Sequence, residues 1–352
     1  MMRTRDTLAL MAIAVLIAAF AGCRDRPVSE VAVVEAEVEA QAEPLTERKV
    51  VTLCYHAMAE ASGSTYELAI ADFREQLQLL ADEGFESVLP SQIADYLEGR
   101  GDLPERAVCI TFDDGPASIL TVSKPAMDAH GFVGAAFLIA DSVGAGGNLT
   151  WDQVRELEAA GWEIGSHTAQ HERPTKIDAE ALRAELSGSR ETIREQIDGD
   201  CDALAYPFGL YDAGVVERAR DAGYRIAFTI DRGPADQTTD PMLVPRQMLV
   251  DGNSLRTFRG WLEQEKLHLE EIAPAIGERV STDVTITARL ADEDVAPGAL
   301  EMSVNGRPVS HDSDSETGVL TIRPELSEGA NNLRVNFHGS PRREFSWLIV
   351  AE

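Results

Sequence analysis

Val108-Cys109-Ile110-Thr111-Phe112-Asp113-Asp114-Gly115 is the stretch of the chain that decides its fold. Its apolar and β-branched residues are typical of a buried strand, and Gly115 and Pro116 favour a turn directly after it. Neighbouring side chains on a strand point to opposite faces, so the pattern alone argues against two ordinary surface charges at Asp113 and Asp114. One of them needs a partner, such as a metal ion or a proton on a substrate. The simpler alternative is a turn in which one aspartate caps the next segment.

Strand and helix patterns alternate around this stretch, from residue 49 to about residue 266. Residues 50–55 are typical of a strand, and residues 71–83 carry apolar side chains at helical spacing. A helix, a glycine, an aromatic residue and a strand then recur, with junctions at Gly84-Phe85, Gly131-Phe132, Gly161-Trp162 and Gly223-Tyr224. Each glycine can adopt the left-handed conformation that ends a helix. The last three junctions precede predicted strands at residues 133–139, 163–165 and 226–230. The alternation predicts a parallel sheet, and the length of the span favours a small (β/α) barrel.

The pattern changes after Pro274 to a period of two residues. It is clear over residues 280–290 and looser over 300–304, 319–322, 332–337 and 345–350. Turn signals such as Asn305-Gly306 separate these runs. Residues 274–352 are therefore predicted to form a small β-sandwich, immunoglobulin-like by the number and spacing of its strands.

The N-terminus has the features of an export signal. Arg3 and Arg5 precede an apolar run over residues 8–21, which predicts a secretory signal peptide over residues 1–22. Cys23 follows Ala21-Gly22 as in a bacterial lipobox, although Phe20 replaces the usual Leu, so cleavage by ordinary signal peptidase is the alternative. Lipidated Cys23 would hold the exported protein at a bacterial membrane, in the periplasm or at the cell surface. Residues 23–48 are predicted to be an acidic tether.

The composition narrows the range of partners. A formal net charge of −29, with 60 acidic and 31 basic residues and no basic patch, argues against a nucleic-acid partner. This acidity suits solubility, a salty environment or a cationic product. Of the four cysteines, three remain if Cys23 is lipidated, and an odd number argues against a disulfide framework. Cys54 and Cys109 lie in apolar runs and are expected to be small buried residues.

A second polar cluster lies in Ile164-Gly165-Ser166-His167-Thr168-Ala169-Gln170-His171, again at the end of a predicted strand. If the chain turns helically, His167 and His171 lie on one face, close enough to share a metal ion. A structural pair of histidines is the alternative. One aspartate with two histidines leaves an open position for water, as in catalytic zinc sites, and the same ligands can hold Fe(II) in oxygenases.

With these two motifs, Thr111-Phe112-Asp113-Asp114-Gly115 and His167-Thr168-Ala169-Gln170-His171, the chain resembles the polysaccharide deacetylases of the NodB-homology type. The resemblance covers roughly residues 49–268. It implies a distorted (β/α) barrel and removal of N-acetyl groups from sugar polymers with Zn²⁺ or another divalent metal. Position by position, the resemblance implies that Asp113 is the catalytic base and that the backbone amide of Phe208 helps to hold the oxyanion. It also implies three metal ligands, which are Asp114, His167 and His171.

Two departures from the family's pattern affect the predicted site. The third motif is Ala205-Tyr206-Pro207-Phe208-Gly209, and the family's common form of it begins with an Arg that pairs with the base. Ala205 occupies that position, and Arg246 is predicted to replace the Arg from another strand. No clear Leu-His motif follows the last strand of the barrel, where His268 lies in a charged, helix-like stretch. His56 instead ends the first strand. This arrangement is similar to the deacetylases of poly-β-1,6-N-acetylglucosamine, in which an early His is the general acid; a buried core role for His56 is the alternative.

The resemblance therefore implies hydrolysis of the acetamide groups of N-acetylglucosamine polymers, with a poly-β-1,6-linked chain as the expected substrate. Asp113 would take a proton from water, and protonated His56 would give one to the leaving amine. Peptidoglycan or chitooligosaccharide deacetylation is an alternative, and so is an inactive, surface-anchored glycan-binding protein. The complete set of Asp-Asp, His-His and His56 argues against an inactive protein. The β-sandwich is interpreted as a spacer or as a sugar-contacting module.

Overall fold

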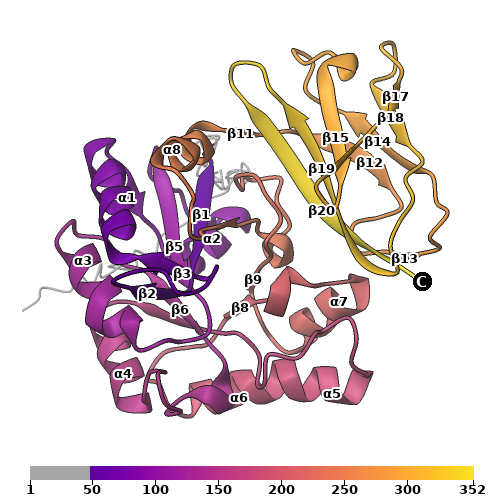
Figure 1. Cartoon of the computed structure of the whole chain (residues 1–352). Coiled ribbons are helices and arrows are strands. Elements are labelled where there is room, and N and C mark those ends of the chain that lie inside the picture. Colours follow the sequence, from indigo (N-terminus) through magenta and orange to yellow (C-terminus); the bar gives the residue numbers. More distant parts are fainter. Residues whose placement is uncertain (1–47) are drawn as a thin grey trace, which may run out of the picture. The chain divides into compact units, whose positions relative to one another are not determined.

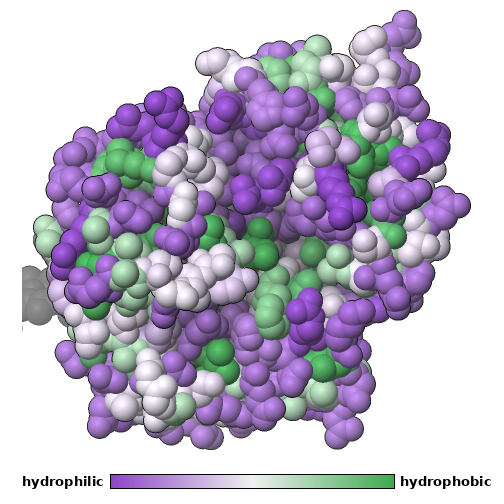
Figure 2. Space-filling model, in the orientation of Figure 1, coloured by the Kyte–Doolittle hydropathy of each residue, from purple (hydrophilic) through white to green (hydrophobic). Residues whose placement is uncertain are grey.

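The computed structural model describes residues 48–352. The predicted signal peptide (1–22), Cys23 and all but the last residue of the predicted tether (23–48) lie outside the described residues. None of the helices within residues 48–352 has the length and apolar character needed to cross a bilayer. The face of the molecule in Figure 2 is mostly hydrophilic, in keeping with the many charged residues of the sequence.

A parallel sheet with helices around it makes up the first part of the described chain (Figure 1). Its strands are β1 (Val50–Tyr55), β4 (Glu86–Ser87), β5 (Ala107–Phe112), β6 (Ala135–Leu138), β7 (Glu163–Ser166), β8 (Ala203–Ala205), β9 (Ile226–Phe228) and β10 (Gln247–Met248). The α-helices are α1 (Ile70–Asp82), α2 (Pro90–Leu97), α3 (Lys124–Asp128), α4 (Trp151–Ala159), α5 (Ala179–Arg183), α6 (Ser189–Arg194), α7 (Ala213–Asp221) and α8 (Leu255–Glu263). A separate short parallel pair consists of β2 (Ala57–Ala59) and β3 (Glu67–Ala69).

The sheet curls into a distorted barrel. Its order is β10-β1-β5-β6-β7-β8-β9, with β4 beside β5, and every pairing is parallel. The segment that contains residues 244–248 links the two ends of this order: Val244 pairs with Phe228 at the end of β9, and Gln247 pairs with Leu53 in β1. The predicted (β/α) fold class is confirmed.

The recurring glycine–aromatic junctions form as expected. Gly84, Gly131, Gly161 and Gly223 have φ values of 72°, 73°, 87° and 89°. At each junction the amide of the following aromatic residue donates to the carbonyl five residues earlier, for example from Phe85 to Leu80 at 2.9 Å. This bond satisfies a carbonyl that the end of a helix leaves without a partner. It also turns the aromatic ring into the core, where all four rings are buried.

The remaining strands form two sheets that share a core. They are β11 (Glu265–Lys266), β12 (Leu269–Ala273), β13 (Arg279–Val280), β14 (Ile286–Leu290), β15 (Leu300–Val304), β16 (Arg307–Val309), β17 (Asp312–Ser313), β18 (Val319–Ile322), β19 (Gly329–Phe337) and β20 (Arg343–Ala351). One sheet has the order β11-β20-β19-β15-β16 with β13 beside β20, and the other has the order β12-β14-β18-β17. Side chains from both sheets, such as Ile322 and Trp347, are buried in one cluster. The all-β prediction is confirmed, and the immunoglobulin-like assignment stays a prediction.

Two local predictions for this region are wrong. Residues 280–290 are not one strand, because the chain crosses here between the sheets: β13 pairs with β20, whereas β14 pairs with β12 and β18. The stretch around His268 is not helical. β11 and β12 flank this residue and pair with β20 and β14, so pairing with the sandwich strands begins at Glu265, before the predicted boundary at residue 268.

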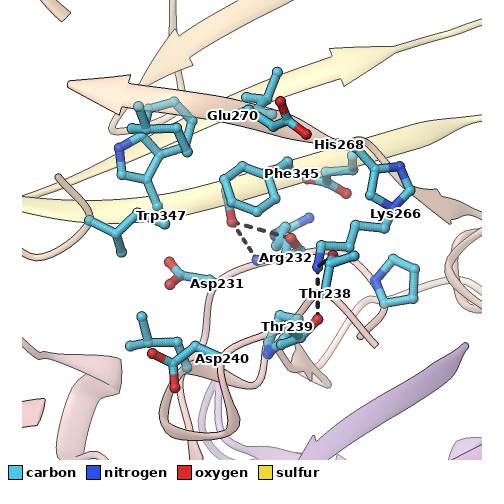
Figure 3. A pocket seen from close by; sticks show the side chains of 18 of the residues that line it. Asp231, Arg232, Thr238, Thr239, Asp240, Lys266, His268, Glu270, Phe345 and Trp347 are labelled. Atoms are coloured by element: carbon cyan, nitrogen blue, oxygen red, sulfur yellow. Dashed lines mark hydrogen bonds between the residues drawn. The ribbon is translucent and has the colours of Figure 1, made fainter. Parts of the chain in front are cut away.

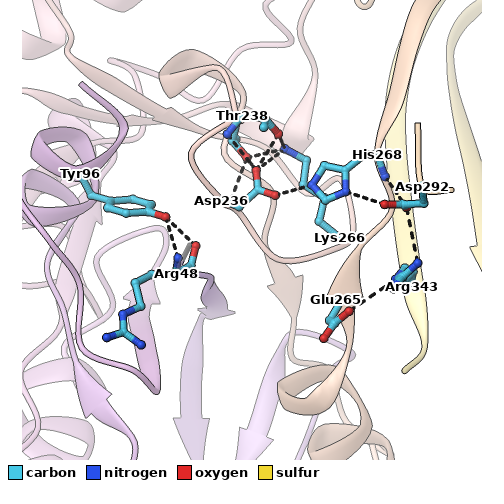
Figure 4. A network of polar contacts seen from close by, with 10 residues as sticks. Arg48, Tyr96, Asp236, Thr238, Glu265, Lys266, His268, Asp292 and Arg343 are labelled. Carbon is cyan, nitrogen blue, oxygen red and sulfur yellow. Dashed lines mark hydrogen bonds and ion pairs between the residues drawn. The ribbon is translucent and has the colours of Figure 1, made fainter. Parts of the chain in front are cut away.

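His268 joins the loop after β9 to the sandwich through a polar network (Figure 4). Its Nε2 lies 2.7 Å from Asp236 Oδ2, and its Nδ1 lies 2.9 Å from Asp292 Oδ1. Lys266 Nζ donates to Asp236 Oδ1 at 2.8 Å. Hydrogen bonds to Asp236 and Asp292 raise the pKa of His268 to about 9 and outweigh the opposing effect of burial. The imidazolium is therefore the favoured form in the folded protein at neutral pH.

We expect the contribution of His268 to stability to depend on pH. Its folded-state pKa of about 9 lies above the ordinary value of 6.5, so the contribution is complete below about pH 6.5 and is lost as the pH rises through about 9. Calorimetric unfolding of the wild type and His268→Gln should show a difference in Tm that is larger at pH 6 than at pH 10. The exposed His338→Gln serves as the control. An equal difference for His268→Gln at both pH values would contradict this role.

Candidate functional site

The predicted site residues meet at one edge of the barrel sheet. His56 follows β1 directly, Asp113 and Asp114 follow β5, His167 follows β7, and Arg246 precedes β10. Because the carboxyl ends of parallel strands lie at the same edge of a sheet, the residues that follow β1, β5 and β7 come together there. Arg246 joins them because the short β10 pairs with Leu53 and Cys54, near the carboxyl end of β1. Phe208 reaches the same edge from the turn after β8 and packs against His171.

One carboxylate and two imidazoles form the first part of the site. Asp114 Oδ1 lies 3.6 Å from His167 Nε2 and 3.9 Å from His171 Nε2. The Nδ1 of His167 lies 2.8 Å from the carbonyl oxygen of Ala205. A carbonyl can only accept, so Nδ1 carries the proton and Nε2 is left as a free ligand facing Asp114. Burial lowers the pKa of His167 despite the nearby carboxylates, and this favours the neutral ring that a metal ion requires.

The backbone at the site is strained. Asp114, Thr168, His171 and Phe208 have φ values of 69°, 66°, 61° and 58°. The left-handed region is unfavourable for residues other than glycine, at a cost of about 1–3 kcal/mol for each strained residue. These four residues lie in three loops, and two of them are predicted metal ligands. Their strained backbone indicates that the fold directs these side chains at a cost in stability. Local hydrogen bonds help, such as the one from the His171 amide to Thr168 Oγ1 at 3.1 Å.

Asp113 and Arg246 form a buried, bidentate ion pair. Arg246 Nη1 donates to Asp113 Oδ1 at 2.7 Å, and Nη2 donates to Oδ2 at 2.8 Å. The side chains are 3% and 0% exposed, and Arg246 Nε donates to the carbonyl of Thr229 at 2.9 Å. Burial alone would raise the pKa of Asp113, but the charge of Arg246 outweighs it and holds this pKa well below the usual range. The structure thus brings the predicted replacement for the third-motif Arg to the predicted base.

The sequence did not reveal one contact of Asp113. Cys54 is buried as expected, yet its Sγ also donates to Asp113 Oδ2 at 3.4 Å. Burial and the negative charge of Asp113 raise the pKa of this thiol, although Arg246 acts in the opposite direction. The alternation of β1 could have given the signal, because Cys54 and His56 are two residues apart and lie on the same side.

His56 lies beside Asp113. One ligand atom each of Cys54, His56 and Asp113 falls within 4.8 Å of the others. The Nδ1 of His56 is buried and has no hydrogen-bond partner among residues 48–352, and the ring centroid lies 5.2 Å from that of Tyr66. A buried ring nitrogen without a partner is costly in a structural histidine, and it can exchange a proton with a bound molecule.

Two exposed aromatic side chains flank the polar groups. Tyr66 is 54% exposed beside His56, and Phe208 is 45% exposed with its ring centroid 4.5 Å from that of His171. The guanidinium of Arg173 lies 4.7 Å from the centroid of Phe208. Exposed rings beside catalytic groups suit the apolar face of a ligand. Tyr66 could not be selected from its sequence pattern, because it lies in an irregular connection between β2 and β3.

Asp114, His167 and His171 have the donor set of a divalent-metal site. One carboxylate oxygen and two imidazole nitrogens lie within 4.8 Å of one another. The hydrogen bond of His167 to Ala205 is the outer contact that commonly orients a metal-ligating imidazole. Three protein ligands of these types leave a position for water, and they suit Zn²⁺ among other divalent ions. Together with an ionised carboxylate and a histidine, this arrangement can support hydrolysis.

Comparisons with known proteins give a consistent result. Residues 100–227 match a family model described as polysaccharide deacetylase. The Bacillus subtilis protein YxkH, whose name places it among the polysaccharide deacetylases, is 25% identical over 218 residues, which are 62% of this chain and 77% of that protein. A poly-β-1,6-N-acetyl-D-glucosamine N-deacetylase of Escherichia coli K12 is 22% identical over 277 residues; the match covers 66% of this chain but only 40% of the relative.

Solved structures share the barrel. The deacetylase PplD of Streptococcus pyogenes, solved in complex with acetate, gives a TM-score of 0.59 at 23% identity and covers 62% of this chain and 100% of its own. IcaB from Ammonifex degensii gives a TM-score of 0.54 at 27% identity and covers 61% and 97% of the two chains. The family match at residues 100–227 includes the Asp-Asp and His-His motifs but neither His56 nor Arg246.

Metal affinity tests the predicted ligands. Loss of a residue that only hydrogen-bonds a metal ligand typically weakens metal binding by roughly 10- to 100-fold. Asp114→Ala should weaken Zn²⁺ binding by more than this, because it removes a ligand and leaves only two imidazoles. Asp113→Asn should change the affinity less. Calorimetric titration of Zn²⁺ into chelator-treated protein measures both. Wild-type affinity in Asp114→Ala would rule this residue out as a ligand.

Proposed function

We propose that the chain is a metal-dependent N-deacetylase of N-acetylglucosamine polymers, with poly-β-1,6-N-acetylglucosamine as its substrate; the match of residues 100–227 to the polysaccharide deacetylase model supports this. As a polysaccharide deacetylase, it is a hydrolase that acts on carbon–nitrogen bonds other than peptide bonds. The observation that carries the proposal is the placement of the Asp114–His167–His171 set beside the buried Asp113–Arg246 pair. The name of the Escherichia coli relative supports the β-1,6 linkage.

Each group has a role that its surroundings support. Asp114, His167 and His171 would hold the metal, which supplies a Lewis acid for the acetamide oxygen and lowers the pKa of water. Asp113 accepts the proton of the attacking water, and Arg246 keeps this carboxylate ionised and fixed in direction. The backbone amide of Phe208 would contribute to the oxyanion site, next to His171.

His56 is the proposed general acid. An amine anion is too poor a leaving group to depart without a proton, so a protonated group must lie on the leaving side. His56 lies next to Asp113, and its buried Nδ1 has no hydrogen-bond partner within residues 48–352. The exposed rings of Tyr66 and Phe208 would stack against the apolar faces of the sugar residues.

Acetate release from a panel of N-acetylated substrates tests the function. The panel contains β-1,6-linked N-acetylglucosamine oligomers, chitooligosaccharides and peptidoglycan fragments, and metal content is measured on the same samples. Release mainly from the β-1,6 oligomers is expected. A preference for either other substrate would support the alternative deacetylase, and binding of the oligomers with no acetate release would support a glycan-binding protein.

Substitution of the two proton-transfer groups should separate chemistry from metal binding. Asp113→Asn and His56→Ala are each expected to retain metal and lose about 10²- to 10⁴-fold in kcat, because each removes one proton-transfer step. The control is His338→Ala, an exposed histidine of the sandwich. Activity of Asp113→Asn near that of the wild type would make the base assignment wrong, and the same result for His56→Ala would require another acid.

We also propose that the chain is exported and held at a membrane by lipidated Cys23. The apolar run over residues 8–21 and the Ala21-Gly22-Cys23 sequence support this location. A membrane-bound location would place the enzyme where exported polysaccharide passes.

A further inference from the structure

The segment Thr229–Asp231 holds Arg246 at two points. The carbonyl of Thr229 accepts from Arg246 Nε at 2.9 Å, and the carbonyl of Asp231 accepts from the Arg246 backbone amide at 2.9 Å. The Asp231 amide in turn donates to Thr229 Oγ1 at 3.0 Å. The position of this short segment therefore sets the direction from which Arg246 approaches Asp113.

The side chain of Asp231 is held by one residue of the sandwich and one residue of the barrel. Asn332 Nδ2 donates to Asp231 Oδ1 at 2.9 Å, and Tyr211 Oη donates to Asp231 Oδ2 at 2.6 Å. The hydroxyl of Tyr211 also accepts from the backbone amide of Leu348 at 3.0 Å. Asn332 and Leu348 lie directly opposite each other in β19 and β20. This cross-strand pair therefore contacts Asp231 directly through Asn332, and indirectly through the hydrogen bond from Leu348 to Tyr211.

Other contacts from the sandwich hold the loop that carries Phe208 and the residue after Asp231. Tyr211 follows Phe208 by three residues and is fully buried. Asp212, the N-cap of α7, accepts from Arg279 at 2.6 Å, and Ser346 in β20 hydrogen-bonds the backbone of Arg232. In Figure 3, Asp231 and Arg232 line a cavity of about 350 Å³ together with Phe345 and Trp347.

The carboxylate of Asp231 has no cationic partner within salt-bridge distance in the described part of the chain, and only 5% of the residue is exposed. Burial raises its pKa to about 7, while its hydrogen bonds to Tyr211, Thr229 and Asn332 act in the opposite direction. A buried acidic group held only by neutral donors is a costly structural element.

From these contacts we propose that the β-sandwich is part of the catalytic unit: Asn332 and Tyr211 are positioning residues that act through Asp231 on Arg246. The sandwich is then neither a spacer nor only a sugar-contacting module. This inference rests on the proposed function, because its effect on turnover presupposes that Asp113 and Arg246 act in deacetylation.

Asn332→Ala in the full-length chain tests the proposal. Loss of the amide frees one oxygen of Asp231, so Arg246 is held less firmly. The expected result is a kcat lowered about 2- to 30-fold, the range typical of residues that act through a neighbour, with unchanged KM and metal content. Asn336→Ala is the matched control: Asn336 lies on the same strand, is similarly part-exposed, and makes no side-chain hydrogen bond within residues 48–352. It should leave kcat unchanged.

A double-mutant cycle distinguishes positioning from general destabilisation. In an Arg246→Ala background, Asn332→Ala should lower kcat no further, because the group through which it acts is gone. Tyr211→Phe should behave in the same way. Equal losses of kcat from Asn332→Ala with and without Arg246 would overturn the proposal, and so would wild-type kcat in Asn332→Ala.

Hydrogen exchange gives a readout that needs no substrate. The Arg246 amide, which donates to Asp231, should exchange faster in Asn332→Ala than in the wild type or Asn336→Ala. If the wild type releases no acetate from any substrate, the proposed function fails, and this exchange rate alone decides the inference. Unchanged exchange at residues 229–246 would overturn it.

Discussion

The buried ion pair of Asp113 and Arg246 is the interaction on which the site depends. Both side chains are almost fully removed from water, and removal of one partner from such a pair typically costs about 3–5 kcal/mol because the other charge stays buried. The surrounding donors and acceptors complete this pair: Thr111, Thr229 and Cys54 each contact one of its members. The strand ends and loops around the pair therefore tolerate little displacement.

The barrel and the sandwich divide the support of this pair between them. Parallel strands bring Asp113, His56 and His167 to one edge, where backbone geometry directs the side chains inward. Arg246 also hydrogen-bonds the loop after β9 through its side chain and its backbone amide. The barrel supplies only part of the contacts that hold this loop. Contacts from β19 and β20 complete that support.

Much of the fold and the site could be predicted from the sequence where a local pattern sets the structure. Asp113, Asp114, His167 and His171 occupy strand ends that periodicity and turn residues reveal, and the glycine–aromatic junctions follow from helix termination. The same reasoning was wrong for His268, because its neighbours owe their conformation to pairing with distant strands. Tyr66 was missed because an exposed ring in an irregular connection follows no period. Cys54 was identified as buried, but its contact with Asp113 depends on the register between β1 and β5.

The separation of Asp113 and Arg246 along the chain has a consequence for how the enzyme matures. The two residues are 133 positions apart, and Arg246 lies in the segment that links the two ends of the sheet order. Until that segment docks, the carboxylate has no counter-charge and resists burial. A chain in which this segment has not docked therefore lacks the ion pair that holds the proposed base in place.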